Sequence, residues 1–363
     1  MIPQAAPASR IARYRSAVDA AIASVIESPN YILGSAVAKF EADFASYVGT
    51  TYCIGVNSGT DALAFSLRAA GVGAGDEVIT TALTAPATAQ AILHCGATPR
   101  FVDVDQRTRC IDPKAVEAAI NPRTAAIVPV HLFGMPCAMS ELTAIAEKYQ
   151  LALIEDCAQA HGATTEGRRL GTFGHAAAFS FYPTKNLGGI GDGGAVLTSD
   201  PDIADRVRRL RNYGVTGDDR MIHSLGFNSR LDDMQAAILS ALLPHLDEGN
   251  TERRAIAERY RALFANTALN LPANDPGGVY HQFAIGHEKR DALQSHLLCA
   301  GIRTNIHYDP CLHRHPAFSS LAAGSFPVAE HLAGSLLSLP IQPETAAASL
   351  PYVAETILEF IRA

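Results

Sequence analysis

The 363-residue chain lacks the features that mark several large classes of protein. No apolar stretch reaches the ~18 residues that cross a bilayer, and the start, MIPQAAPASR, lacks the charged beginning and apolar core of a signal peptide. We therefore expect a cytoplasmic protein with no membrane partner. Lys and Arg total 29 against 36 acidic residues and form no basic run, which argues against nucleic acid as a partner.

The seven cysteines are scattered, odd in number and without a C-x-x-C pair. This pattern supports neither a disulfide framework nor a thiolate metal site, and we expect small buried side chains instead. Three histidines, His307, His313 and His315, lie close together in the sequence. Because no H-E-x-x-H pattern accompanies them, we predict no metal site.

Hydrophobic residues make up 48% of the chain and charged residues 18%, which is typical of a folded globular protein. From residue 52 onward, short apolar runs alternate with helix-length stretches. The predicted strands are 52–56, 77–81, 99–103, 125–130 and 151–155, and the predicted helices are about 60–71, 86–96, 112–120 and 138–149. This alternation predicts an α/β fold with a mainly parallel sheet covered on both faces, whose sites lie at the carboxyl ends of the strands.

The alternation stops at 175–198, where two apolar runs flank a Gly-rich segment and predict a hairpin or a loop-linked pair of strands. Helical patterns return at 201–213 and from Asp232 to about Arg261. Within the second of these, Pro244 either kinks one long helix or separates two.

We place a domain boundary near this proline. A large domain of residues 1–245 would carry an N-terminal helical arm, with helical patterns at 9–27 and 37–47. A smaller C-terminal α+β domain, residues 246–363, would hold a strand at 279–285 and helices at 289–300 and near the C-terminus.

Four polar segments follow predicted strands or open predicted helices. The first is NSGTDAL at 57–63. The hydroxyls of Ser58 and Thr60 suit a helix cap, and the N–H groups at a helix start attract an anion. An ordinary helix cap would explain the same residues.

In the second segment, the apolar strand LALI runs into Glu155 and Asp156, with Gln159 and His161 close behind. An acid at the end of a buried strand needs a partner. That partner is either a cationic group of a ligand, or a neighbouring arginine or helix cap. We expect His161 to be structural.

The third segment, AFSFYPTKNLGG, holds Lys185 in a loop that is otherwise apolar, hydroxylic or glycine. Burial of such a loop would lower the pKa of the lysine and free its amine to attack a carbonyl. In the fourth, GFNSRLDDMQAA at 226–237, a polar turn opens a helix that Asn228 could simply cap.

Taken together and in this order, the segments resemble the DegT/DnrJ/StrS family of sugar aminotransferases, which use pyridoxal 5′-phosphate (PLP). The resemblance runs from about Tyr31 to Pro340. The stretches that carry it are NSGTDAL, GDEVIT, FVDVD, IVPVHLFG, EDCAQAHGA, GTFGHAAAFSFYPTKNLG, GDGG and NSRLDDMQAA. It implies a large α/β domain with a mainly parallel seven-stranded sheet between helices, plus the smaller C-terminal α+β domain.

Carried over by motif, the resemblance makes Lys185 the lysine that forms a Schiff base with PLP and Asp156 the partner of the pyridinium nitrogen. Both are implied to be catalytic. Further residues are implied to bind the cofactor: Ser58, Gly59, Thr60, Ala85, Gln159, Ser180 and Asn228. Of these, Gln159 would lie on the 3′-hydroxyl side of the ring. Ala85 stands where many relatives place an aromatic ring over it.

The implied reaction moves an amino group from L-glutamate to a keto group of a nucleotide-linked deoxysugar, with pyridoxamine 5′-phosphate (PMP) formed in the first half. A dTDP-linked 3-keto-6-deoxyhexose is favoured, and UDP- or GDP-linked 4-keto sugars and cyclitol ketones remain alternatives. Tyr182, His307 and Tyr308 are the predicted substrate contacts. Asn228 would reach the cofactor of a neighbouring subunit, which implies a homodimer with a shared site.

Two alternatives share the cofactor. Sugar dehydratases that resemble this family have His in place of the lysine, so Lys185 argues against that activity. A PLP-binding regulatory protein would keep the fold without the reaction, and the intact Lys185, Asp156 and Ser180 argue against it.

Overall fold

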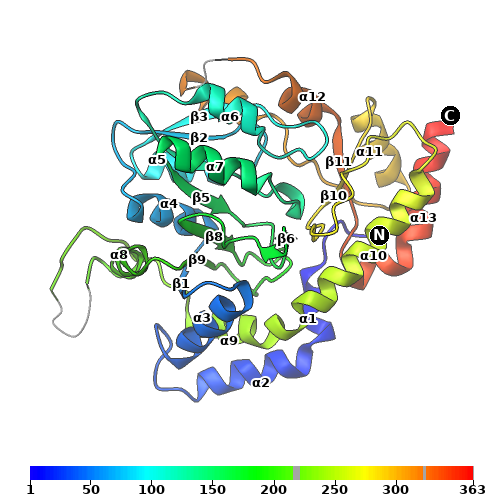
Figure 1. The fold of residues 1–363 in the computed structure, drawn as a ribbon. Helices are drawn as coiled ribbons and strands as arrows, with labels where there is room; N and C mark the ends of the chain where they lie inside the picture. Colours follow the sequence, from blue (N-terminus) through cyan, green and yellow to red (C-terminus); the bar gives the residue numbers. More distant parts are fainter. Residues whose placement is uncertain (216–220, 322–323, 363) are drawn as a thin grey trace.

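The computed structural model describes residues 1–215, 221–321 and 324–362. Its centre is a seven-stranded sheet in the order β1-β9-β8-β5-β4-β2-β3 (Figure 1). The strands are β1 (Tyr52–Val56), β2 (Glu77–Thr81), β3 (Thr98–Val102), β4 (Thr124–Val128), β5 (Ala152–Asp156), β8 (Ala176–Ser180) and β9 (Gly194–Thr198). Only β9 runs antiparallel to its neighbours β1 and β8. The predicted α/β fold with a mainly parallel sheet is confirmed, as is the predicted hairpin-like pair at 175–198.

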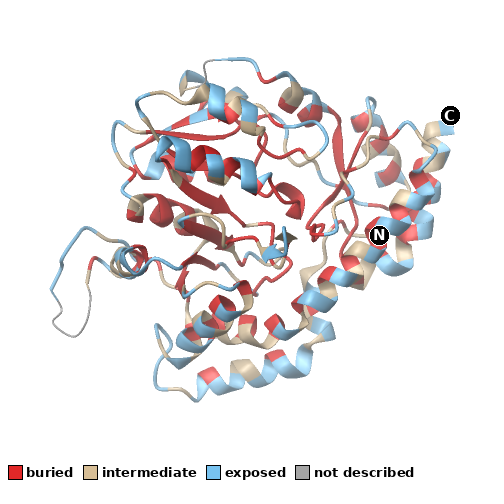
Figure 2. Ribbon diagram, in the orientation of Figure 1, coloured by how far each residue is buried: buried red, intermediate tan, exposed pale blue. Residues whose placement is uncertain are grey.

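Helices cover both faces of the sheet (Figure 1). One apolar core lies beneath α4 (Gly59–Ala69), α5 (Pro86–His94) and α8 (Pro201–Arg211). A second lies beneath α3 (Ser35–Val48), α6 (Pro113–Ala119) and α7 (Met139–Tyr149). The strands are mostly buried, apart from two exposed residues of the edge strand β3, whereas each helix buries one side (Figure 2). This explains why the strands read as continuous apolar runs.

Strand β5 shows how the sheet sorts its side chains. Leu153 joins the core under α7, and Ile154 joins the core under α4. Because successive side chains of a strand point to opposite faces, the two acids that follow are separated in the same way. Glu155 therefore lies on the α7 side and Asp156 on the α4 side.

Two segments that the sequence shows as continuous helical patterns, the first part of the N-terminal arm and the segment around Pro244, each form two helices. The pattern at 9–27 forms α1 (Pro7–Arg13) and α2 (Arg15–Ile26), which meet at Tyr14. Near Pro244 the chain forms α9 (Asp233–Leu242), a 3-10 turn at Leu243–His245 and α10 (Leu246–Phe264). Proline has no N–H to continue the helical bonds, so it separates two helices.

After α10, the described residues of the C-terminal part form a two-stranded antiparallel sheet and three α-helices. These elements are β10 (Phe283–Gly286), β11 (Leu336–Leu339), α11 (Arg290–Cys299), α12 (Pro327–Ser335) and α13 (Pro343–Arg362), and a small hairpin, β6 (Thr164–Thr165) and β7 (Arg168–Arg169), lies earlier in the chain. The boundary between residues 1–245 and 246–363 stays a sequence-based prediction. In the described part of the chain, no helix has both the length and the apolar character needed to cross a membrane.

The strand predicted at 279–285 begins four residues later than expected. The first residues of the predicted strand bind the 3-10 turn at Leu132–Gly134 instead of a neighbouring strand: Val279 N donates to Gly134 O at 2.9 Å, and Gln282 N donates to Phe133 O at 3.4 Å. The apolar pattern correctly predicted that residues 279–285 are buried. It did not predict that the backbone of 279–282 bonds to a turn and not to a strand.

Candidate active site

A cavity of about 240 Å³ lies at the carboxyl ends of the central strands. All the predicted cofactor and substrate residues line it except Asn228, His307 and Tyr308. The residues shared by the prediction and the cavity wall are Ser58, Gly59, Thr60, Ala85, Asp156, Gln159, Ser180, Tyr182 and Lys185. Segments more than 100 residues apart in the sequence thus meet in one space.

The start of α4 forms one end of this cavity. Ser58 is its N-cap, and the Ser58 Oγ accepts from the backbone N–H of Asp61 at 3.1 Å. A side chain at Gly59 would come within 2.7 Å of Ser180 Cβ, so glycine permits the helix start to touch the end of β8. The Ser180 hydroxyl, Thr60 and the N–H groups of the first helical turn therefore surround one place, which suits an anion.

Asp156, at the end of β5, is buried and also lines the cavity. Its Oδ2 accepts from the Thr88 hydroxyl at 2.9 Å, and its Oδ1 accepts from the Ala158 N–H at 3.1 Å. Burial raises the pKa of Asp156, while these donors and the charge of Lys185 oppose that rise. The carboxylate is thus fixed in orientation and faces a cationic neighbour.

Lys185 lies in the loop after β8. Burial lowers its pKa to about 8, and the charge of Asp156 works in the opposite direction. The chain has five lysines, and the other four, Lys39, Lys114, Lys148 and Lys289, are exposed. Lys185 is therefore the lysine whose amine is neutral in an appreciable fraction near pH 8.

Three histidines lie close enough to Lys185 to feel its charge. Burial, reinforced by Lys185, lowers the pKa of His161 to about 3 and that of His307 to about 4. The pKa of His281 is also held well below its usual value by burial. All three imidazoles are thus neutral near pH 7, and Lys185 is the basic group in its surroundings that titrates near that pH.

Gln159 links the cavity to the C-terminal part of the chain. Its Oε1 accepts from the Phe133 N–H at 2.7 Å, and its Nε2 donates to the Tyr308 hydroxyl at 3.0 Å. His307 is bonded through Nδ1 to the Ser338 hydroxyl at 2.9 Å. Neither His307 nor Tyr308 is among the residues that line this cavity, and Tyr308 contacts a lining residue, Gln159.

Asn228 is exposed and lies outside the cavity of its own chain. Its Oδ1 accepts from Arg230 Nη2 at 2.5 Å. The alternative that Asn228 caps the following helix is wrong, because Asp232 is the N-cap of α9 and accepts from Gln235 N at 2.7 Å.

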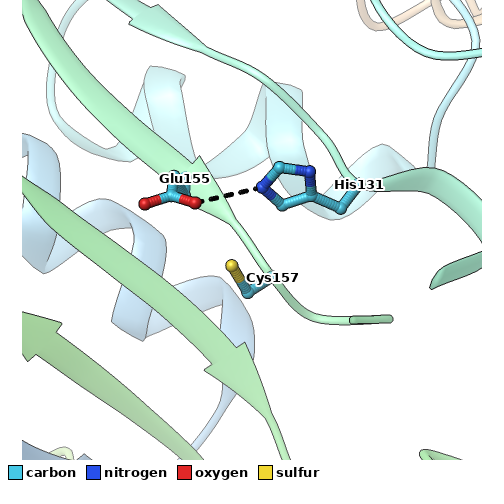
Figure 3. A group of neighbouring side chains, drawn as sticks. All are labelled: His131, Glu155 and Cys157. Carbon is cyan, nitrogen blue, oxygen red and sulfur yellow. Dashed lines mark hydrogen bonds and ion pairs between the residues drawn. The ribbon is translucent and has the colours of Figure 1, made fainter. Parts of the chain in front are cut away.

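Glu155, the neighbour of Asp156, belongs to a different cluster. Figure 3 shows its carboxylate facing the ring of His131, with the sulfur of Cys157 nearby. The carboxylate accepts from His131 Nε2 at 3.2 Å and from three backbone N–H groups, those of Gly171, Phe173 and Gly174. Burial alone would raise the pKa of Glu155, but these partners hold it below its usual value.

The second nitrogen of His131 also has a partner, since Nδ1 accepts from the Cys137 N–H at 3.1 Å. Both groups therefore already have protein donors or acceptors, and a cation would have to displace them. We assign Glu155 and His131 a structural role. Because side chains alternate along β5, Glu155 and its partner His131 lie on the face of the strand opposite to Asp156.

Comparison with known proteins identifies the arrangement. Residues 13–358 match the DegT/DnrJ/EryC1/StrS aminotransferase family. The chain belongs to this family. The predicted family, the aminotransferase class and PLP as the cofactor are confirmed.

Two curated relatives of the family are similar over nearly the whole chain. The dTDP-3-amino-3,4,6-trideoxy-alpha-D-glucose transaminase of Streptomyces venezuelae is 48% identical over 91% of this chain and 88% of its own length. The UDP-N-acetyl-3-dehydro-alpha-D-glucosamine 3-aminotransferase of Acidithiobacillus ferrooxidans is 43% identical over 98% and 97%.

Solved structures of the family share the fold. S. venezuelae DesV, in complex with a ketimine intermediate, has a TM-score of 0.97 and 44% identity, and the match covers 100% of this chain and 99% of DesV. NtdA from Bacillus subtilis, with bound cofactor PMP, has a TM-score of 0.91 and 30% identity, covering 97% and 82%.

Among the lining residues that were not predicted from the sequence, Thr88 is the one whose side chain binds Asp156. Thr88 donates to Asp156, and it lies just inside α5, after the carboxyl end of β2. The rule that sites gather at strand ends could have drawn attention to it. Its hydroxyl gave no further signal, because threonine is also common at helix starts.

Proposed function

We propose that the protein transfers an amino group from L-glutamate to the 3-keto group of a nucleotide-linked deoxysugar, with a dTDP-linked 3-keto-6-deoxyhexose as the favoured substrate. The observation that carries this proposal is the pairing, in one cavity, of Lys185 at a pKa of about 8 with the buried acid Asp156. Both curated relatives described above carry position 3 in their names, which supports C3 over C4.

The residues present fit PLP. The anion-binding end formed by the α4 start, Thr60 and Ser180 would hold the phosphate, and Asp156 would hold the ring nitrogen in its protonated form. When bound, the cofactor supplies an electron sink for the carbon that loses a proton. The hydrogen bonds from Thr88 and the Ala158 N–H would hold the Asp156 carboxylate in its orientation toward the ring nitrogen. Because both groups donate, they favour the ionised form of Asp156.

Lys185 would act as both nucleophile and base. Its lowered pKa leaves part of the amine neutral at neutral pH, which both roles need. As a base, Nζ would take the proton from the substrate carbon that carries nitrogen. His161 and His307 are neutral near pH 7, so they add no positive charge beside Lys185.

Tyr182, His307 and Tyr308 are the proposed contacts for the sugar nucleotide. Tyr182 lines the cavity and is 53% exposed, so its hydroxyl is open to a ligand. A diphosphate is costly to desolvate without donors, and phenol and imidazole groups provide them. Because the Tyr308 hydroxyl also binds Gln159, it could act through the cofactor side of the site, and the two roles are separated by the kinetics described below.

A homodimer with a shared site completes the proposal. The described residues on either side of 216–220 extend away from the body of the chain (Figure 1) and carry exposed apolar side chains. They are Tyr213, Met221, Ile222, Leu225 and Phe227, with Leu225 89% exposed. Such a group of exposed apolar residues favours burial against a partner, and a second copy would place Asn228 at its neighbour's phosphate end.

The direct test incubates the purified protein with L-glutamate and a panel of 3-keto and 4-keto nucleotide sugars linked to dTDP, UDP or GDP, plus a cyclitol ketone. Mass spectrometry then detects the amino sugar and 2-oxoglutarate. Amination of the dTDP-linked 3-keto sugar supports the proposal, and preference for a 4-keto sugar or cyclitol overturns its substrate. A Lys185→Ala protein serves as the inactive control.

A further inference from the structure

Arg10, in the N-terminal helix α1, is connected to the loop that carries Lys185. Arg10 is 8% exposed, and its guanidinium reaches that loop across more than 170 positions of sequence. Nη1 donates to Lys185 O at 2.5 Å and to Asn186 O at 3.2 Å. Nη2 donates to Pro183 O at 2.9 Å and to Gly188 O at 2.8 Å. One side chain thus binds four carbonyl oxygens of a six-residue segment.

The loop has few backbone bonds of its own. Lys185 N donates to Tyr182 O at 2.9 Å, and Gly189 N donates to Phe181 O at 2.9 Å. The segment between them forms neither helix nor strand. Its buried carbonyls need donors from elsewhere, and the guanidinium provides them.

The local sequence fits this contact. A side chain at Gly188 would lie within 2.9 Å of Arg10 Nη2, so glycine keeps the approach open. Asn186 is anchored separately, because its Nδ2 donates to Asn250 Oδ1 at 2.9 Å and to Val279 O at 3.1 Å. The backbone on both sides of Lys185 Cα is therefore fixed to other parts of the chain.

The N-terminal segment is itself hydrogen-bonded to the C-terminal part of the chain at several points. These bonds fix the position of α1, from which Arg10 extends. Ile2 N donates to Gly301 O at 2.8 Å, and Arg303 N donates to Ile2 O at 2.9 Å. The side chain of Gln342 exchanges two hydrogen bonds of 2.7 Å with the backbone of Ala6. Helix α1 lies beside α13 (Figure 1).

We propose that Arg10 is a positioning residue, which fixes the backbone of residues 183–188 and so holds the Lys185 amine at its place in the cavity. The inference rests on the proposed role of Lys185. Arg10 touches neither the cavity nor the reacting atoms. It acts through the loop.

The test uses the apoprotein, so that no readout depends on cofactor chemistry. Arg10→Met removes the donors, and Arg10→Lys keeps the charge but presents its donors from one nitrogen instead of a fork. Arg109→Met is the matched control. Arg109 is also buried and donates to backbone carbonyls, those of Ala284 and Asn270, away from the Lys185 loop.

Amide hydrogen exchange of a peptide spanning 181–190 is measured first. In Arg10→Met we expect exchange at least ~10-fold faster there, with Arg10→Lys between it and the wild type and Arg109→Met unchanged. The second readout is the pH dependence of Lys185 modification by an amine reagent, followed by mass spectrometry. Its midpoint should move upward from about 8 in the Arg10 variants, because a loosened loop admits water.

The proposal is overturned if Arg10→Met lowers the melting temperature as Arg109→Met does, yet leaves loop exchange and the Lys185 midpoint at wild-type values. If Arg10→Met does not fold, the same two readouts on Arg10→Lys decide the question. Failure of the proposed function looks different: a Lys185→Ala protein would then still transaminate.

Discussion

Replacement of Asp156 by Asn removes one charge from the site with little change in shape. The carboxylate accepts from the Ala158 N–H and from the Thr88 hydroxyl. An Asn side chain can turn its oxygen to the N–H and its amide to the hydroxyl, which can accept as well as donate. The variant should therefore fold and still bind PLP.

The Asp156→Asn protein should catalyse the reaction more slowly. A neutral partner no longer holds the ring nitrogen protonated, and we expect proton abstraction to slow by ~10²-fold or more, which is ~2.7 kcal/mol of transition-state stabilisation. The pKa of Lys185 should also fall below about 8, because the Asp156 charge is what raises it against burial. Stopped-flow absorbance of the glutamate half-reaction measures the first effect, and a titration of the apoprotein amine measures the second.

Glu155→Gln is the matched control for this experiment. It neutralises the adjacent acid, which lies on the opposite face of β5 and accepts from three backbone N–H groups. We expect a loss of stability of about 1–3 kcal/mol and a normal half-reaction in the folded fraction. An Asp156→Asn protein with a wild-type half-reaction would show that another acid holds the ring nitrogen, and the reasoning would fail.

Three further predictions follow from the site. The rate at which the apoprotein takes up PLP should rise with pH and reach half its maximum at about 8, since the neutral amine of Lys185 is the reactive form; a rate that is flat from pH 6.5 to 9.5 contradicts this. Asn228→Ala should weaken cofactor binding by about 1–3 kcal/mol, and a monomer seen by sedimentation should lose cofactor; a fully active monomer would refute the shared site. Tyr308→Phe and His307→Ala should raise the KM for the sugar nucleotide and spare the glutamate half-reaction; equal damage to both halves would mean that they support the cofactor instead.

The sheet and its helices were predictable because buried parallel strands are continuous apolar runs, and these runs are unambiguous from residue 52 to residue 156. The late start of β10 was not, because Val279 and Gln282 bond to backbone that is distant in sequence. The division at Tyr14 was not either, since the ring of Tyr14 stacks on His245, a residue far along the chain. Helix α12 and strand β11 were also not predicted from the sequence.

Within the site, the family motifs located the cavity residues and distinguished Asp156 from Glu155. Strand alternation supplies the physical reason for that distinction, once β5 is known to end at residue 156. Arg10 carried no signal at all, since a lone arginine in an N-terminal helix is typical of a solvated face. Only the fold shows that it is buried against the Lys185 loop.

The central claim is that Lys185 binds the cofactor. Borohydride treatment of the purified yellow protein, followed by peptide mass spectrometry, tests it most directly, because reduction makes the lysine–cofactor bond permanent. The account predicts one phosphopyridoxyl group per chain on the peptide that contains Lys185, and none in Lys185→Ala. A label on one of the four exposed lysines, or a label that persists in Lys185→Ala, would contradict it.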